Sequence, residues 1–185
     1  MKYEIDIEGV CPMLQNRLSK ELNDTKKDIK KEKLEKWEQD NWRKKLYTDD
    51  SGRVVIKAQA IYKMLQEACS KTQTRPPKHI GRTWGYYFKS SVIPLEDAVV
   101  NNAQITQLGT MVNGNPSAKG KSSKVFTIRP LVSMGWKATL SIVDLGDELD
   151  KVIVEEIASA AGKFIGVGDW RPLHGRFKIN KVRAV

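Results

Sequence analysis

The sequence predicts an α+β protein built on a ferredoxin-like core with the order β-α-β-β-α-β. Three observations lead to this prediction. An alternating strand pattern opens the chain, two segments have helical periodicity, and a strand-like segment follows each of these helices. Two stretches interrupt this order as insertions, a charged helical one at about 14–50 and a basic loop or hairpin at about 99–125. At 185 residues the chain is expected to form a single domain covering residues 1–185.

Residues 2–9 form the first predicted strand, because apolar and charged side chains alternate along them. Tyr3, Ile5 and Ile7 share one face, which we expect to be buried, while charged residues fill the other face. The strand is expected to end at Gly9.

Residues 14–46 form the charged part of the first insertion, with good helix formers and neither glycine nor proline. A thin apolar stripe, which includes Leu14, Leu22 and Trp37, predicts one or two exposed helices. Two roles remain open for this segment, a solvated insertion without a specific partner or a basic arm that contacts a neighbouring subunit.

The first core helix is predicted over residues 57–71, directly after the short β-branched run 54–56. Its apolar residues fall near one helical face; they are Ala58, Ile61, Leu65 and Ala68. Residues 72–91 begin as a basic loop, and the overlapping aromatic segment 86–95 predicts a strand that ends at Pro94.

Residues 99–125 are polar and glycine-rich, with a strong turn signal at 113–116. This composition predicts a mobile loop or a long flexible hairpin. Strands are predicted next over residues 125–132 and 135–145, the second because its apolar residues alternate with polar ones.

Residues 146–164 are the clearest predicted helix of the chain. Asp147 is the expected N-cap, and Gly162 stands where a left-handed C-terminal cap is expected. A glycine-rich turn follows, and the last strand is predicted over residues 175–182.

The formal net charge of +10 and the pI near 9.6 favour a polyanionic partner, of which nucleic acid is the most common. Lysine-rich helices that are merely solvated are the alternative source of this charge. The two cysteines, Cys11 and Cys69, are far apart and are expected to be buried free thiols. No metal ion or cofactor is expected. The apolar runs are too short to span a membrane, and the N-terminus does not resemble a signal peptide, so we expect a cytoplasmic protein.

Three segments together resemble a known superfamily: the opening strand YEIDIEGV, the segment VVIKAQAIYKMLQEA, and the turn GVGDWRPLHGRF. They are similar to the RAMP superfamily, the ferredoxin-like proteins that form the backbones and processing enzymes of CRISPR ribonucleoproteins. In that superfamily an extended stretch leads into the first helix, and a glycine-rich loop lies between the last helix and the last strand. The turn also resembles the C-terminal GxGDWRPxxGRF-like signature of an uncharacterised set of phage and mobile-element proteins. The resemblance implies an RNA partner and assembly of copies side by side along a strand.

The glycine-rich turn is the first candidate nucleic-acid site. Its glycines allow backbone amides to approach a phosphate, its arginines can neutralise phosphates, and its rings can stack on bases. The candidate residues are Gly166, Gly168, Trp170, Arg171, His174 and Arg176. The structural alternative places Trp170 and Phe177 in the core and pairs Arg171 with Asp169 or another carboxylate.

Two further segments are candidates for the same role. The basic and aromatic segment 75–89 combines cations with stacking surface; its candidates are Lys78, Arg82, Trp84 and Tyr86. If this segment is a strand, Trp84, Tyr86 and Phe88 share one face, and one of the two faces belongs to the core. Lys119, Lys121 and Lys124 form either a phosphate-contacting finger or a soluble loop.

These patterns predict a non-enzymatic protein that binds single-stranded nucleic acid through phosphate contacts and base stacking, with RNA slightly favoured over DNA. One alternative is a metal-independent endoribonuclease that uses His79 or His174, the only histidines, as general acid or base. Nothing in the sequence pairs these two residues. The other alternative is a phage protein-interaction module whose charged 14–46 segment binds a host complex.

Overall fold

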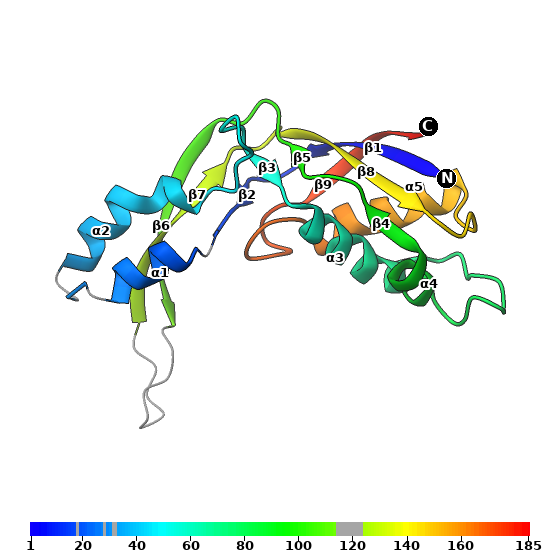
Figure 1. Cartoon of the computed structure of the whole chain (residues 1–185), viewed down its shortest axis with the longest axis horizontal. Helices are drawn as coiled ribbons and strands as arrows, with labels where there is room; N and C mark the ends of the chain where they lie inside the picture. The colour runs from blue at the N-terminus through cyan, green and yellow to red at the C-terminus, as the bar shows by residue number, and fades with distance from the viewer. Residues whose placement is uncertain (18, 28, 31–32, 114–123) are drawn as a thin grey trace, which may run out of the picture.

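A computed structural model describes residues 1–185 apart from 18, 28, 31–32 and 114–123 (Figure 1). Its main sheet has 4 antiparallel strands in the order β4-β8-β1-β9. Their bounds are β4 Val92–Pro94, β8 Lys137–Asp144, β1 Lys2–Gly9 and β9 Phe177–Ala184. β8 lies between β1 and β4, and β1 lies between β8 and β9. The pairs β1/β4 and β8/β9 are each joined through a helix, so in each pair the two strands are separated in the sheet by a strand of the other pair.

The two faces of this sheet differ in chemistry because side chains alternate along each strand. Tyr3, Ile5 and Ile7 of β1 are buried against the helices. The opposite face of β1 presents Glu4, Asp6 and Glu8, which pair with cations of the neighbouring strand β9. The prediction for the first strand and its buried face is confirmed.

Helices α3, Ala58–Ala68, and α5, Lys151–Ala160, cover the apolar face of the sheet (Figure 1). Both were predicted from their periodicity. Their core residues meet those of the sheet, with Leu65 of α3 and Ile157 of α5 beside Ile5 of β1. A 3-10 turn, η3 Cys69–Lys71, extends α3, and Cys69 is buried while Cys11 is only half-buried.

The prediction of a strand over 86–95 was wrong for most of its length. Residues Trp84–Ser91 form the helix α4, and only Val92–Pro94 pair as a strand. Trp84, Tyr87 and Phe88 are buried, at the i, i+3, i+4 spacing of a helix. Tyr86 points to solvent, so the expected shared face of positions 84, 86 and 88 does not exist.

Both caps predicted for the last helix were misplaced. Asp150, not Asp147, is the N-cap of α5, and its carboxylate accepts a hydrogen bond from the backbone N–H of Ile153 at 2.8 Å. Gly162 is buried within a π-turn, η4 Ala161–Ile165, that extends the helix. Gly166, with φ of +74°, ends this turn instead.

The two insertions lie together at the other end of the molecule (Figure 1). In the second insertion, β6 Ile105–Asn113 pairs over its full length with β7 Lys124–Val132, so the hairpin includes the strand that was predicted to follow the insertion at 125–132. The first forms α1 Lys20–Lys27, α2 Leu34–Asn41 and a 3-10 turn, η2 Trp42–Lys45. It begins with a strand that was not predicted, β2 Met13–Leu14, which pairs with β7. Two short strands, β3 Val55–Ile56 and β5 Ala98–Val99, pair between the two ends of the molecule.

The charged first insertion is not uniformly solvated, because Glu38 of α2 and Lys45 of η2 are buried against β7. Glu38 accepts a hydrogen bond from the backbone N–H of Ile128 at 2.7 Å, and Lys45 donates one to the carbonyl of Ile128 at 2.8 Å. This side-chain pair takes the place of a neighbouring strand along the part of β7 that the short strand β2 does not cover.

Among the described residues, no helix is long and apolar enough to span a membrane.

Candidate nucleic-acid interface

The glycine-rich turn is fixed to the chain segment that leaves β1. The N–H of Gly175 donates to the carbonyl of Pro12 at 2.9 Å, and the N–H of Asp169 donates to the carbonyl of Leu14 at 2.8 Å. The turn also closes on itself, because the N–H of Val167 donates to the carbonyl of Gly175 at 2.9 Å. Gly168 and Gly175 have φ of +87° and +77°, values that favour glycine. The turn is therefore a fixed loop whose backbone conformation explains its glycines.

Trp170 is held beneath a cation that the sequence did not connect to it. The guanidinium carbon of Arg129, on β7, lies 4.2 Å from the centre of the Trp170 ring. Arg129 also pairs with Asp169 at 3.0 Å. Trp170 is half-buried and has φ of +55°, a strained conformation for a bulky residue and one that is enriched at binding sites.

The two arginines of the turn have different environments. Arg171 pairs with Glu67 of α3 at 3.3 Å, so its partner is another carboxylate than Asp169, as the structural alternative allowed. Arg176 donates a hydrogen bond to the carbonyl of Pro172 at 2.8 Å and is exposed. His174 lies beside Trp170, with ring centres 6.3 Å apart. Phe177 is a core residue, as the same alternative expected.

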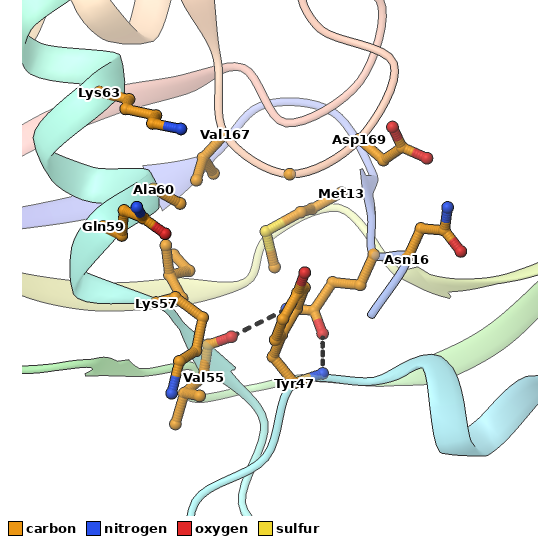
Figure 2. Close-up of a pocket in the computed structure, with 13 residues that line it drawn as sticks. Met13, Asn16, Tyr47, Val55, Lys57, Gln59, Ala60, Lys63, Val167 and Asp169 are labelled. Carbon is orange, nitrogen blue, oxygen red and sulfur yellow. Dashed lines mark hydrogen bonds between the residues drawn. The ribbon is translucent and has the colours of Figure 1, made fainter. Parts of the chain in front are cut away.

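A groove of about 400 Å³ separates the turn from the first half of α3 (Figure 2). Lys57, Gln59 and Lys63 lie on one side of it, and Asn16 and Asp169 lie on the other. Its floor is braced by the buried Gln15, which donates to the carbonyl of Val55 at 2.9 Å and accepts from the N–H of Tyr47 at 2.8 Å. Lys63 is exposed and makes no ion pair among the described residues.

The groove continues along α3 into a second hollow. Gly168 and Asp169 line both, and the second is bounded by Glu67, Trp170 and Arg171. Lys63 and Glu67 are one helical turn apart on α3. The two hollows together form a track between α3 and the glycine-rich turn, and we call this track the α3 groove.

The basic loop before α4 lies beyond the end of α3. Arg75 and Arg82 line a shallow hollow there together with Cys69 and residues of the loop. Lys78 and Arg82 are exposed, as a phosphate-binding role requires. Trp84 is 3% exposed, and its indole N–H donates to the carbonyl of Thr74 at 3.0 Å, so its ring offers no stacking surface. Tyr86 is 76% exposed and is available for stacking.

The lysines of the second insertion are only partly described. Lys124 is exposed at the start of β7, whereas Lys119 and Lys121 lie outside the described residues.

The two histidines lie at opposite ends of α5. His79 is exposed, with its Nε2 atom 3.1 Å from the carboxylate of Glu148, which precedes the helix. His174 belongs to the turn that follows the helix, and its Nδ1 atom is buried without a hydrogen-bond partner in the described part of the chain. A helix of 10 residues is about 15 Å long, so these histidines do not form a catalytic pair.

Sequence reasoning missed three cations of this region: Lys57, Lys63 and Arg129. Lys63 had a usable signal, because it is a cation on the polar face of a helix that was predicted correctly. Arg129 had none, because only the pairing of β7 with β2 brings it to the glycine-rich turn.

Comparisons with known proteins support the fold alone. No protein-family model and no curated protein sequence matches the chain. A chain in the cryo-EM structure of the Type III-B Cmr-beta bound to cognate target RNA matches with a TM-score of 0.56 and 12% identity over 98% of this chain. This chain spans 59% of the length of that protein. The crystal structure of Cmr6 from Pyrococcus furiosus matches with a TM-score of 0.53 and 9% identity, over 98% of both chains. The chain therefore has a RAMP-like fold with mixed helices and antiparallel sheets.

Proposed function

We propose that this protein binds single-stranded RNA in the α3 groove, as a non-enzymatic subunit of a CRISPR-type ribonucleoprotein. The groove is the observation that carries the proposal. It joins Lys63, which makes no ion pair among the described residues, the paired cations Lys57 and Arg171, a fixed glycine-rich backbone and a half-buried Trp170 ring in one track. Cations and rings along one track are the combination that binds single strands with little sequence readout.

The open face of the main sheet does not offer a competing surface for base stacking. In RNA-recognition domains the exposed sheet face stacks on bases. Here that face carries Glu4, Asp6 and Glu8 on its central strand β1, and these carboxylates already pair with cations of β9. Arg183 is engaged with Glu4 and Asp6, so it is not free to bind a phosphate.

The fold supports the same proposal at a coarser level. The strand order β4-β8-β1-β9, with α3 and α5 on one face, fits the ferredoxin-like split βαβ plan. The structure of the Type III-B Cmr-beta, which shares the fold, was solved with bound target RNA. Two further parts of the proposal rest on the sequence resemblance alone. They are side-by-side assembly of copies along the strand and the likeness of the turn to phage and mobile-element proteins.

Replacing Lys63 with glutamine is expected to weaken binding of a single-stranded RNA about five- to tenfold at low salt, because one phosphate contact is lost. The plot of log affinity against log salt should become shallower by about 0.7, the value for one contact on a single strand. Fluorescence anisotropy titrations over a salt series measure both quantities.

The matched control is Lys181→Gln, which removes another exposed cation, this one from the open sheet face. Binding equal to that of the original protein is expected. Equal weakening by both substitutions would show that general charge binds the RNA and that the α3 groove does not. Denaturing gels of the RNA after incubation test the ribonuclease alternative. Cleavage of the RNA by the original protein, and its loss in His79→Ala or His174→Ala, would support that alternative.

A further inference from the structure

A separate hollow lies between the charged helices and the hairpin, and four of its lining residues are basic. Its volume is about 190 Å³. Its polar lining consists of Asn16, Arg17, Asn23, Lys26, Lys45, Thr127 and Arg129. None of its described lining residues is acidic. We call this hollow the arm pocket.

The charges around the arm pocket do not balance. Lys26 and Lys45 share one carboxylate, that of the fully buried Glu38. Arg129 pairs with Asp169, and Arg17 makes no ion pair among the described residues. Two carboxylates thus pair with three of the four cations, which leaves the pocket with an excess of positive charge.

The guanidinium of Arg129 has unused hydrogen-bond donors. Its Nε and Nη1 atoms are buried and have no hydrogen-bond partner in the described part of the chain, although Nε is 3.0 Å from Oδ2 of Asp169. A buried donor without a partner is costly, at about 1–3 kcal/mol. The Trp170 ring packs against this guanidinium and restrains its plane, and Arg129 lines the pocket.

The remaining lining fits a small anion. Arg17 is positioned by its backbone, whose N–H donates to the carbonyl of Lys45 at 2.8 Å. The ammonium groups of Lys26 and Lys45 lie 5.5 and 5.9 Å from the centre of the Trp37 ring, which keeps them on one wall. At about 30 Å³ per water, the pocket has room for a phosphate group with a few waters and no room for an oligonucleotide.

The arm pocket adjoins the α3 groove, because Asn16 lines both. We infer that the arm pocket holds a phosphate group of the same strand that lies in the groove, contacted by Arg17 and Arg129. This inference rests on the proposed function and adds a path: the strand runs from the turn past Asn16 and beneath the charged helices.

The test compares Arg17→Gln with Lys20→Gln, which removes an exposed cation of the same segment outside the pocket. Each protein is titrated with single-stranded RNA of about four and about twelve nucleotides. We expect Arg17→Gln to weaken binding of the longer strand about five- to tenfold and to lower its salt slope by about 0.7. Binding of the short strand, which the groove alone can hold, should be unchanged, and Lys20→Gln should change neither.

Three other results would overturn the inference. If Lys63→Gln weakens the longer strand and Arg17→Gln does not, the strand does not enter the arm pocket, while the proposed function stands. If neither RNA binds the original protein, the proposed function fails and the inference fails with it. Calorimetry with inorganic pyrophosphate gives the third result. If pyrophosphate binds, and Arg17→Gln abolishes this binding without weakening RNA binding, the pocket takes a free anion and not the strand.

Discussion

Replacing Glu38 with alanine is expected to lower the free energy of unfolding by about 3–5 kcal/mol, the usual result of removing one partner of a buried ion pair. Glu38 is fully buried and accepts hydrogen bonds from Lys26, Lys45 and the backbone N–H of Ile128. Without it, the buried ammonium of Lys45 loses its counter-charge and the edge of β7 loses a partner. Urea unfolding followed by circular dichroism measures the change.

Glu35→Ala is the matched control, because Glu35 is exposed on the same helix α2. This substitution should change stability by less than about 0.5 kcal/mol, as is usual at exposed positions. If the two variants are equally stable, the charged helices do not depend on Glu38 for their packing against β7.

The same carboxylate should make stability depend on pH. Burial raises the pKa of Glu38, but hydrogen bonds from Ile128, Lys26 and Lys45 outweigh burial and hold the pKa below its usual range. A lowered pKa in the folded state stabilises the protein above the unfolded pKa of about 4.3, and this stability is lost as the pH falls through the folded value. Glu38→Gln should therefore lose less stability between pH 6 and pH 3 than the original protein, by unfolding curves at each pH. Equal losses would assign the acid sensitivity to other carboxylates, such as Asp6, whose pKa is lowered by Arg183.

The elements that sequence reasoning predicted correctly are those whose burial pattern is local. Tyr3, Ile5 and Ile7 alternate because one face of β1 is buried, and the apolar stripe of α3 repeats because one helical face is buried. The strong turn signal at 113–116 predicted a hairpin within 99–125 as one of two alternatives, whereas β7 was predicted separately as the strand 125–132.

The failures have identifiable causes. Consecutive aromatic residues at 86–88 favour a strand by propensity, but tertiary packing selects a helix that buries Trp84, Tyr87 and Phe88. The i, i+3, i+4 spacing of these three residues indicated a helix, but the strand propensity of the aromatic run favoured the opposite prediction. Glu38 and Lys45 carry no signal in a run of similar charges, because only contact with β7 distinguishes them from their solvated neighbours.

The candidate site shows the same division. The glycine-rich turn could be found from sequence because positive φ angles demand glycine. The opposite wall of the α3 groove and the cation over Trp170 come from α3 and β7, which are far away along the chain. Long-range pairing of this kind leaves no trace in one sequence.

Replacing Gly175 with alanine should be the most damaging single change in the turn. Gly175 has φ of +77°, and a Cβ atom there would overlap the carbonyl oxygen of Val167. The overlapping atom belongs to the backbone of Val167, which is hydrogen-bonded to Gly175, so no side-chain rotation relieves the overlap. Strain and overlap together should lower the free energy of unfolding by about 3 kcal/mol or more. Single-stranded RNA binding should fall with it, because the turn forms one wall of the α3 groove.

Gly52→Ala separates the two causes. Gly52 has the same φ of +77°, but a Cβ atom there would meet nothing within 4 Å, so alanine at this position adds strain alone, about 1 kcal/mol. The difference between the two variants is therefore the free energy of the overlap between Gly175 and Val167. If Gly175→Ala is no worse than Gly52→Ala, the turn can open without loss, and its glycines are not what fixes the wall of the groove. If Gly175→Ala remains folded at low temperature but no longer binds RNA there, while Gly52→Ala binds normally, the geometry of the turn itself is required for binding.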